Sequence, residues 1–327
     1  MNKKIIIGLL LSIVLIYLSV RGIDFRETVT SLKNIAWGYA LLALLVIFIM
    51  QALRSFRWGV ILQPLEKIDQ FTLFSVTCVG FLAIAAIPAR LGELARPYLI
   101  ARKSSIKMSS ALGAVVVERV LDSLSVLIIT VVVVIWHDLP PWLIKSAILF
   151  FILTLLMLLF IIVLIWRRNM AVSLIAWVLR RLPNKIAIRL DGLIHHFIDG
   201  FEVIKDVRML LYLFFLSAVV WLVDVVAIYL LLVAFGFDLP LLAPFILMIV
   251  LIAGIAIPTA PGYIGNWHFA CILGLSLFGV PASEALSFAL VYHFLSIALV
   301  VVLGVIFLPF NKFSLSDMKK QMDQSEA

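Results

Sequence analysis

The chain has 327 residues, of which 65% are hydrophobic and only 13% are charged, and its mean hydropathy is +1.21. This composition excludes a soluble globular domain, and the long unbroken apolar runs predict a polytopic α-helical membrane protein rather than a barrel of short alternating strands. The net charge of +8 comes from Lys and Arg residues between apolar runs, so it indicates orientation in the membrane and contact with anionic lipid, not nucleic-acid binding. The two cysteines lie in apolar segments, which excludes a disulfide framework and a cysteine-based zinc site.

A membrane-spanning helix needs about 20 apolar residues. The clear predicted spans are Ile5–Val20, Trp37–Leu53, Ser109–Trp136, Leu143–Trp166, Met209–Phe235 and Glu284–Leu308. We interpret the first as an uncleaved span, because no small-residue cleavage site precedes Arg21. Two further segments, Phe71–Leu99 and Leu241–Phe278, are apolar but interrupted by Pro and Gly, which is typical of discontinuous or re-entrant helices. The predicted fold is an all-α integral membrane protein with about six to eight spans.

Positive charge predicts the orientation of these spans. Lys and Arg gather at one set of span ends, whereas the opposite connections at 137–141 and 236–240 contain neither residue type. The positive-inside rule therefore predicts cytoplasmic N- and C-termini in a multi-pass protein of a bacterial or archaeal cytoplasmic membrane. If the two broken segments are re-entrant, the first dips in from the cytoplasmic side and the second from outside. If each crosses the membrane twice, the sidedness is unchanged, so charge does not decide between the two topologies.

We predict a single transmembrane domain over 1–310, and its parts are a first half at about 37–166, a linker at 171–208, a second half at about 209–309 and a polar cytoplasmic tail at 311–327. Apolar residues in the linker recur at spacings of three and four between Ile186 and Ile204, which predicts an amphipathic helix on the cytoplasmic surface. His195 and His196 lie within this stretch. We interpret them as solvated, because no metal-ligand spacing accompanies them.

The two broken segments resemble each other. Pro88 and Gly92 are four residues apart, as are Pro261 and Gly265, and an Ala-Leu pair and a polar residue follow each motif at matching spacings. These residue types are common in membrane helices, so chance similarity is the alternative. Because charge places the segments on opposite faces, we predict an inverted repeat, which builds a central site from broken helices. The predicted structural breaks are Pro88, Gly92, Pro258, Pro261, Gly262 and Gly265.

Three ionisable residues lie within a predicted span. Glu118, Arg119 and Asp122 share one helical flank, where each charge costs about 2.5–3.5 kcal/mol at the bilayer centre. One interpretation is a structural ion cluster that holds helices together. The other is a substrate site in which Arg119 meets a lipid phosphate, because a guanidinium donates two parallel hydrogen bonds to such a group.

A second charged group precedes this span. Arg90, Glu93 and Arg96 are three residues apart and would share a face of a helix that starts after Pro88. We predict that they bind substrate, and cytoplasmic anchoring of the two arginines is the alternative.

The second half of the chain carries fewer charges. Asp224 stands alone in an apolar run, so we expect it to face the protein interior, with Arg119 or a histidine as its partner. His268 and His293 are candidate substrate-binding or proton-linked residues, and histidines that only pack are the alternative. The arginines that follow the second predicted span, Arg54 and Arg57, are interpreted as anchors at the membrane interface.

The motifs PARLGELARPYLI, ERVLD and PTAPGYIGNWHFA resemble the transmembrane region of lysylphosphatidylglycerol synthases, in the order in which that family has them. The resemblance covers about 5–309 and implies an inner-membrane protein that moves polar lipids between leaflets. The matching positions are Pro88, Arg90, Gly92, Glu93, Arg96, Glu118, Arg119, Asp122, Pro261, Gly262 and Gly265. The family often has Glu at the position of His268 and Arg at that of His293. These two departures weaken the carry-over of the family's lipid substrate, lysyl-phosphatidylglycerol, to this chain. The aminoacyl-transfer domain has no counterpart here, so the resemblance implies no synthase activity.

The sequence contains no P-loop, dinucleotide fingerprint, nucleophile elbow or metal-ligand cluster, so we predict no enzyme activity, no cofactor and no metal. The preferred function is a flippase or scramblase-like transporter of a phospholipid or a polyprenyl-phosphate-linked lipid. The alternatives are a scaffold for a membrane glycosyltransferase or an envelope-lipid enzyme, and a lipid-modifying transferase that uses the Glu118 and Asp122 carboxylates. The expected partners are membrane lipids and, in the scaffold interpretation, such an enzyme; a homodimer is left open.

Overall fold

The computed structural model describes residues 3–87, 92–136, 139–166, 192, 195–256 and 260–311, and it contains no β-strand in this part of the chain. The elements of the first part are α1 (Lys3–Val20), α2 (Phe25–Lys33), α3 (Trp37–Leu62), α4 (Gln70–Ala86), α5 (Ala95–Lys103), α6 (Met108–Trp136) and α7 (Pro141–Trp166). Those of the second part are η2 (Glu202–Lys205), α10 (Val207–Ala234), α11 (Ala243–Ala256), η3 (Pro261–Tyr263), α12 (Asn266–Ser276) and α13 (Ala282–Asn311). The all-α membrane fold predicted from the sequence is confirmed.

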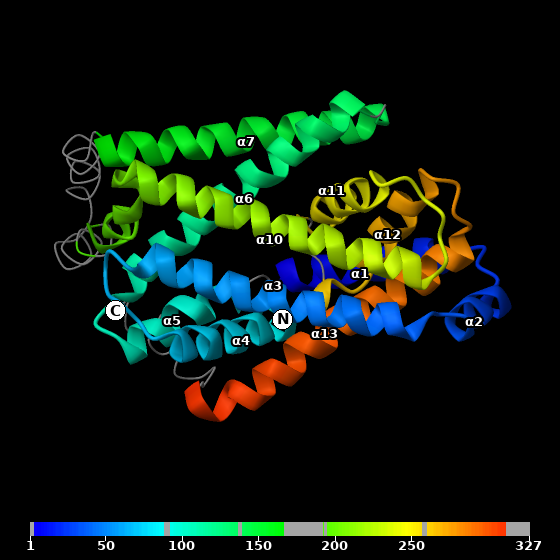
Figure 1. Ribbon diagram of the computed structural model, residues 1–327, viewed down its shortest axis with the longest axis horizontal. Helices are drawn as coiled ribbons and strands as arrows, with labels where there is room; N and C mark the ends of the chain where they lie inside the picture. Colours follow the sequence, from blue (N-terminus) through cyan, green and yellow to red (C-terminus); the bar gives the residue numbers. More distant parts are fainter. Residues whose placement is uncertain are drawn as a thin grey trace.

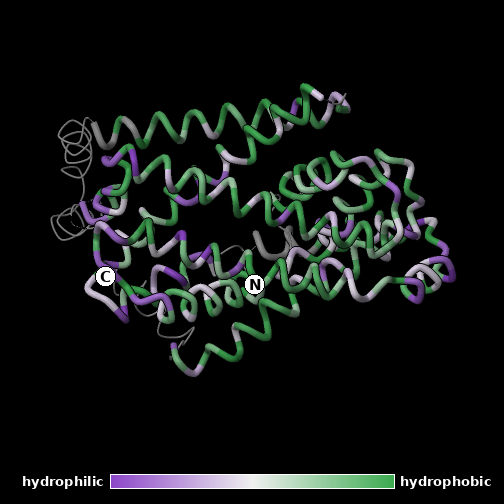
Figure 2. The backbone as a smooth tube through the Cα atoms, viewed as in Figure 1, coloured by the Kyte–Doolittle hydropathy of each residue, from purple (hydrophilic) through white to green (hydrophobic). Residues whose placement is uncertain are grey.

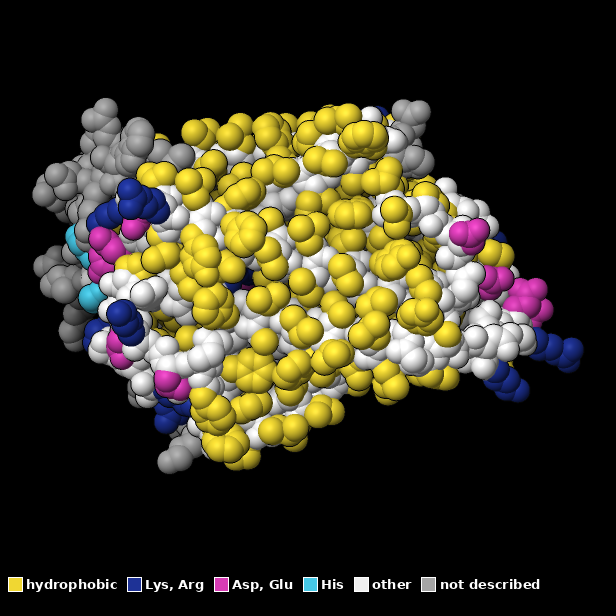
Figure 3. Space-filling model, in the orientation of Figure 1, with side chains coloured by type: hydrophobic (Ala, Val, Ile, Leu, Met, Phe, Trp, Pro, Cys, Tyr) yellow, Lys and Arg dark blue, Asp and Glu magenta, His cyan; other side chains and the backbone are white. Residues whose placement is uncertain are grey.

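Helices α3, α6, α7, α10 and α13 are long and apolar enough to cross a membrane. Helices α1, α4 and α11 are apolar but shorter in the described residues. Hydrophilic positions gather at the two ends of the molecule and hydrophobic ones fill the middle (Figure 2). The same division appears on the surface, where a broad apolar belt separates two charged ends (Figure 3). The long axis of the molecule therefore lies across the membrane.

The helices pack as two groups around a central antiparallel pair. Helices α3 and α10 lie against each other and run in opposite directions (Figure 1). Helix α13 packs along α4, and α11 packs against α6. Helix α7 is the outlying member, since α6 is the only helix against which it makes more than sparse contacts among the described residues. Side chains buried between these helices form two apolar cores, one toward each end of the molecule.

Each group contains a helical hairpin with a break at its tip. Helices α4 and α5 lie in the left half of Figure 1, whereas α11 and α12 lie in the right half. In the first break, a Cβ atom at Gly92 would collide with the backbone of Ala83 and Ile84, so glycine permits the close approach. In the second, Gly262 and Gly265 have positive φ angles of 68° and 98°, which the chain uses to turn into α12.

Only part of the predicted amphipathic linker helix is described, because residues 167–191 and 193–194 lie outside the described part. The helical stretch at 195–199 ends at Gly200 and is followed by the 3₁₀ helix η2. Gly200 packs directly on the backbone of α6 beside Ser110 and Gly113, and Phe201 is buried. This part of the apolar stripe therefore packs on protein, because two glycines let the backbones meet.

Candidate functional site

A network of ion pairs lies inside the helical bundle, between α3, α5 and α6. The Arg57 guanidinium donates to both carboxylate oxygens of Asp122, and its Nη2 lies 3.2 Å from Oε1 of Glu118. It also donates to Oγ of Ser217 on α10, at 2.7 Å. The Arg57 side chain is only 1% exposed. A buried charge of this kind is stable only when it is paired and hydrogen-bonded, as it is here.

Arg96 forms the second branch of this network. Its two Nη atoms donate to the two carboxylate oxygens of Glu118, at 3.2 and 2.9 Å, in the bidentate geometry that guanidinium favours. The Arg96 guanidinium also stacks 4.2 Å from the centre of the Trp58 ring. Arg96 is thus buried behind Glu118 and joins α5 to α6.

Arg119 occupies the open edge of the network. Its Nη2 lies 3.3 Å from Glu118 Oε1, and its Nη1 lies 3.7 Å from Asp122 Oδ2. Unlike Arg57 and Arg96, its side chain is 43% exposed. The helical spacing explains this arrangement, because Glu118 and Asp122 lie one turn apart on the inner flank of α6 while Arg119 is rotated toward its edge.

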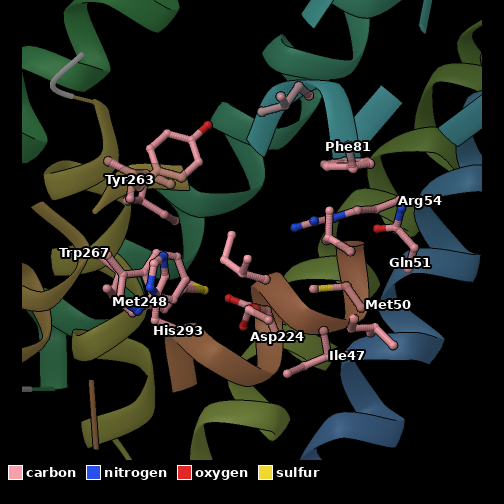
Figure 4. Close-up of a pocket in the computed structure, with 18 of the residues that line it drawn as sticks. Ile47, Met50, Gln51, Arg54, Phe81, Asp224, Met248, Tyr263, Trp267 and His293 are labelled. Carbon is pink, nitrogen blue, oxygen red and sulfur yellow. The ribbon is translucent and has the colours of Figure 1, made fainter. Parts of the chain in front are cut away.

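Beside the network is a cavity of about 250 Å³, and helices of both halves of the chain line it. Glu118, Arg119 and Asp122 reach it from α6, and Arg54 reaches it from α3. Figure 4 shows the Arg54 and Asp224 side chains both directed into this space, among Met50, Met248 and other apolar residues. The chain therefore gathers ionisable side chains around a small cavity in the apolar part of the bundle, where a charge without a partner is costly.

The second half of the chain supplies aromatic and titratable residues to the cavity. Asp224 accepts a 3.4 Å hydrogen bond from the Tyr292 hydroxyl, so the Arg119 or histidine partner expected from the sequence is replaced by a tyrosine. His293 Nε2 is 2.7 Å from the carbonyl oxygen of Gly262 at the broken segment. The rings of His268 and His293 lie edge to face with their centres 4.8 Å apart. The cavity wall is thus tied to the second break.

The predicted site residues have different surroundings. Glu118, Arg119, Asp122, Asp224 and His293 line the cavity, whereas Arg96 and His268 stand behind its lining. Glu93 is half-buried in the turn before α5 and does not line the cavity. The predicted residues Pro88, Arg90 and Pro258 lie outside the described residues.

The structure corrects the interpretation of Arg54 and Arg57 as anchors at the membrane interface. Helix α3 does not end at Leu53 but continues to Leu62, so both arginines lie within the helix. The missed signal was the apolar run from Trp58 to Leu62, which resumes the span after Arg57. The cavity aromatics could not have been singled out, because similar residues are common throughout the membrane helices.

The fold and the site together define a multi-pass α-helical membrane protein that encloses a charged cavity. The chain belongs to the family of the lysylphosphatidylglycerol synthase TM region, whose profile matches residues 5–304. It is 25% identical over 303 residues to a UPF0104 membrane protein of Methanothermobacter thermautotrophicus, covering 88% of each chain. A UPF0104 membrane protein of Methanocaldococcus jannaschii is 25% identical over 315 residues, which cover 93% of this chain and 94% of the relative. The resemblance drawn from the motifs is confirmed.

Proposed function

We propose that this protein is a flippase or scramblase-like transporter, which moves a phospholipid or a polyprenyl-phosphate-linked lipid between the leaflets of a cytoplasmic membrane without altering it chemically. The observation that carries the proposal is the charged cavity within the helical bundle. A lipid headgroup is too polar to cross hydrocarbon unaided, and this cavity offers it hydrogen bonds and opposite charge on the way.

An apolar groove next to the cavity supports an amphiphilic substrate. The groove has a volume of about 350 Å³ and is formed by α6, α7 and α11. Ile252 of α11 borders both spaces, and on α6 the cavity residue Asp122 is followed one turn later by the groove residue Val126. A headgroup in the cavity can therefore keep its acyl chain in the groove or in the surrounding lipid.

The packing of the helices supports the inverted repeat as a part of this proposal. Exchanging α3, α4, α5 and α6 for α10, α11, α12 and α13 turns the pair α4–α13 into α11–α6, and both pairs are in contact. The same exchange maps α4–α5 onto α11–α12, α5–α6 onto α12–α13, α3–α4 onto α10–α11, and α3–α6 onto α10–α13. Two halves of opposite orientation would alternate the access of one central site by moving against each other.

The proposed route follows from the residues around the cavity. The headgroup enters from the cytoplasmic side near Arg90, Glu93 and Arg96, passes Arg119 at the open edge of the ion network, and leaves past His293. The exposed guanidinium of Arg119 is the group that meets the lipid phosphate, whereas Arg57 and Arg96 hold the two carboxylates in place. In this proposal both chain termini are cytoplasmic.

The test is lipid movement in proteoliposomes that contain the purified protein and a phospholipid labelled on its acyl chain. An impermeant reductant bleaches the outer leaflet, so continued bleaching reports lipid that arrives from the inner leaflet. We expect faster bleaching than in protein-free vesicles, and slower bleaching for Arg119→Ala and Glu93→Ala. Lys145→Ala, which removes an exposed charge on α7 outside the cavity, is the control and should match the wild type.

Two results would contradict this proposal. Wild-type protein that moves no labelled phospholipid or polyprenyl-phosphate lipid faster than empty vesicles would remove the function. Wild-type rates for both Arg119→Ala and Glu93→Ala would remove the site assignment while leaving the transport function intact.

A further inference from the structure

Two ionisable side chains that face the cavity, Arg54 and Asp224, have no group of opposite charge within salt-bridge distance among the described residues. The Arg54 guanidinium makes no hydrogen bond or salt bridge with any other residue of the described ranges. The Phe81 ring centre lies 5.5 Å from its Cζ, and the carboxylates of Asp224 and Asp122 act on it electrostatically without touching it. Asp224 has only the 3.4 Å hydrogen bond from Tyr292 within the same ranges. Unlike Arg57, these two groups are left open to a ligand.

The surroundings of Asp224 suit an organic cation. The Trp267 and Tyr292 rings meet edge to face with centres 5.1 Å apart, and Trp267 also lies 5.5 Å from the His293 ring. Figure 4 shows Trp267 and His293 on the side of the cavity opposite Arg54, with Asp224 between them and Arg54. Trp267 and Tyr292 line the cavity together with Asp224, and a carboxylate in a cavity lined by aromatic rings suits an ammonium group. The indole Nε1 of Trp267 is buried without a hydrogen-bond partner in the described structure, so it is a further donor for a ligand oxygen.

The surroundings of Arg54 suit an anion instead. Its guanidinium extends into the cavity from α3 beside Gln51, and the Phe81 ring covers one side (Figure 4). Arg119 borders the same cavity from α6. A planar guanidinium binds a phosphodiester through parallel hydrogen bonds, and a flanking ring keeps it oriented.

We propose that the cavity takes a zwitterionic lipid headgroup, whose phosphodiester passes from Arg119 at the open edge to Arg54 and whose ammonium binds at Asp224. This inference rests on the proposed transport function and narrows its substrate class. A zwitterion satisfies both open charges at once, whereas a purely anionic headgroup leaves Asp224 facing negative charge. The ammonium-bearing aminophospholipids are the simplest lipids of this class.

The experiment compares two lipids that differ in the headgroup alone. Acyl-labelled phosphatidylethanolamine supplies a phosphodiester and an ammonium, and acyl-labelled phosphatidylglycerol supplies the phosphodiester without the cation. We expect the wild type to move phosphatidylethanolamine faster. Arg54→Gln should slow both lipids at least tenfold, the effect of losing about 1.4 kcal/mol of binding. Asp224→Asn should slow phosphatidylethanolamine by a similar factor and spare phosphatidylglycerol, so that the selectivity disappears. Lys145→Gln should change neither rate.

A measurement on the unmodified protein complements these variants. Short-chain, water-soluble forms of the two lipids are added to the wild type, and thermal unfolding is followed. The zwitterionic form should raise the unfolding temperature more than the anionic form at equal concentration, because only bound ligand stabilises the folded state. This comparison applies even if a variant does not fold.

Three outcomes would overturn the inference, and they can be told apart from failure of the transport proposal. If the wild type moves phosphatidylglycerol as fast as or faster than phosphatidylethanolamine, transport stands and the zwitterion site is wrong. If Asp224→Asn slows both lipids equally, Asp224 acts on the scaffold and not on an ammonium group. Equal stabilisation by the two short-chain lipids would likewise reject the headgroup preference. Movement of neither lipid would remove the inference together with transport of phospholipids.

Discussion

Replacing Arg57 by methionine tests whether the buried ion network holds the bundle together. The substitution keeps an unbranched side chain of similar length and removes only the charge and the donors. It deletes the paired hydrogen bonds to Asp122, the 2.7 Å bond to Ser217 and the 3.2 Å contact with Glu118. It therefore releases contacts between α3, α6 and α10 in one step.

The remaining ion pairs of the network limit how much the Arg57→Met substitution lowers the free energy of unfolding. Removing one partner of a buried ion pair costs about 3–5 kcal/mol, because the other charge is left buried. Glu118 keeps its bidentate bond from Arg96, and Asp122 keeps Arg119 at 3.7 Å and the indole of Trp221 at 3.2 Å. We therefore expect a loss near the lower limit, about 3 kcal/mol. At about 2 °C per kcal/mol for a chain of this length, the unfolding temperature should fall by about 6 °C.

The assay is thermal unfolding of the purified protein in lipid nanodiscs, with Arg26→Met as the matched control. Arg26 is an exposed arginine of α2, and its loss should have little effect. Asp122→Asn and the double variant complete a mutant cycle. Because the two residues share one interaction, the summed losses of the single variants should exceed the loss of the double variant by about 1–3 kcal/mol. Additivity within about 0.5 kcal/mol, or an unfolding temperature for Arg57→Met equal to that of the control, would refute the reasoning.

The remaining predictions concern the groove, the second break and a helix cap. Ala253→Trp should fill the groove between α6, α7 and α11 and slow lipid movement in proteoliposomes, whereas Leu156→Trp on the exposed face of α7 should not; equal rates would separate the groove from transport. Gly265→Ala should destabilise the fold by about 1–3 kcal/mol, because its φ is 98° and the new Cβ would lie 2.8 Å from the carbonyl oxygen of Ser12; Gly236→Ala, at φ 71° with open space around it, should cost less in the same unfolding assay. Hydrogen bonds from Thr72 lower the pKa of Asp69, which caps α4, so its stabilisation is present above the ordinary carboxyl pKa and is lost as the pH falls through the lowered value. Asp69→Ala should thus lower the unfolding temperature at pH 7 and have less effect under strongly acidic conditions, and an equal effect at both would count against the cap.

Hydropathy predicted the class of the fold and most of its long helices, because a helix in hydrocarbon must satisfy its own backbone and cover itself with apolar side chains. The boundary of α3 was wrong for the same reason. Arg54 and Arg57 suggested the end of a span, yet the helix continues to Leu62 since Asp122 and Glu118 neutralise Arg57 from a distant helix. A pairing between residues 65 positions apart leaves no trace in local hydropathy.

The cavity was only partly predictable. Glu118, Arg119 and Asp122 stood out as charges in an apolar run, and the structure adds which of them are sealed and which is exposed. Spacing could not supply that division, because it depends on whether Arg96 folds back from α5 onto Glu118. Periodicity predicted the apolar stripe of the linker, but it could not show that the part around Gly200 packs on α6 at Gly113.

Two neighbouring arginines on α3 differ in what surrounds them. Arg54 and Arg57 lie three residues apart on α3, within a single turn. Arg57 is enclosed by two carboxylates and a serine hydroxyl, so any ligand that displaced it would break the contact between α3, α6 and α10. Arg54 makes no hydrogen bond or salt bridge in the described structure and faces the cavity across from Asp224, so a ligand bound to it would break no salt bridge between helices. A charge that has no salt-bridge partner inside a membrane helix needs water or a polar headgroup to offset the desolvation of that charge. The cavity between the two opposed helical hairpins has room for such a group beside Arg54.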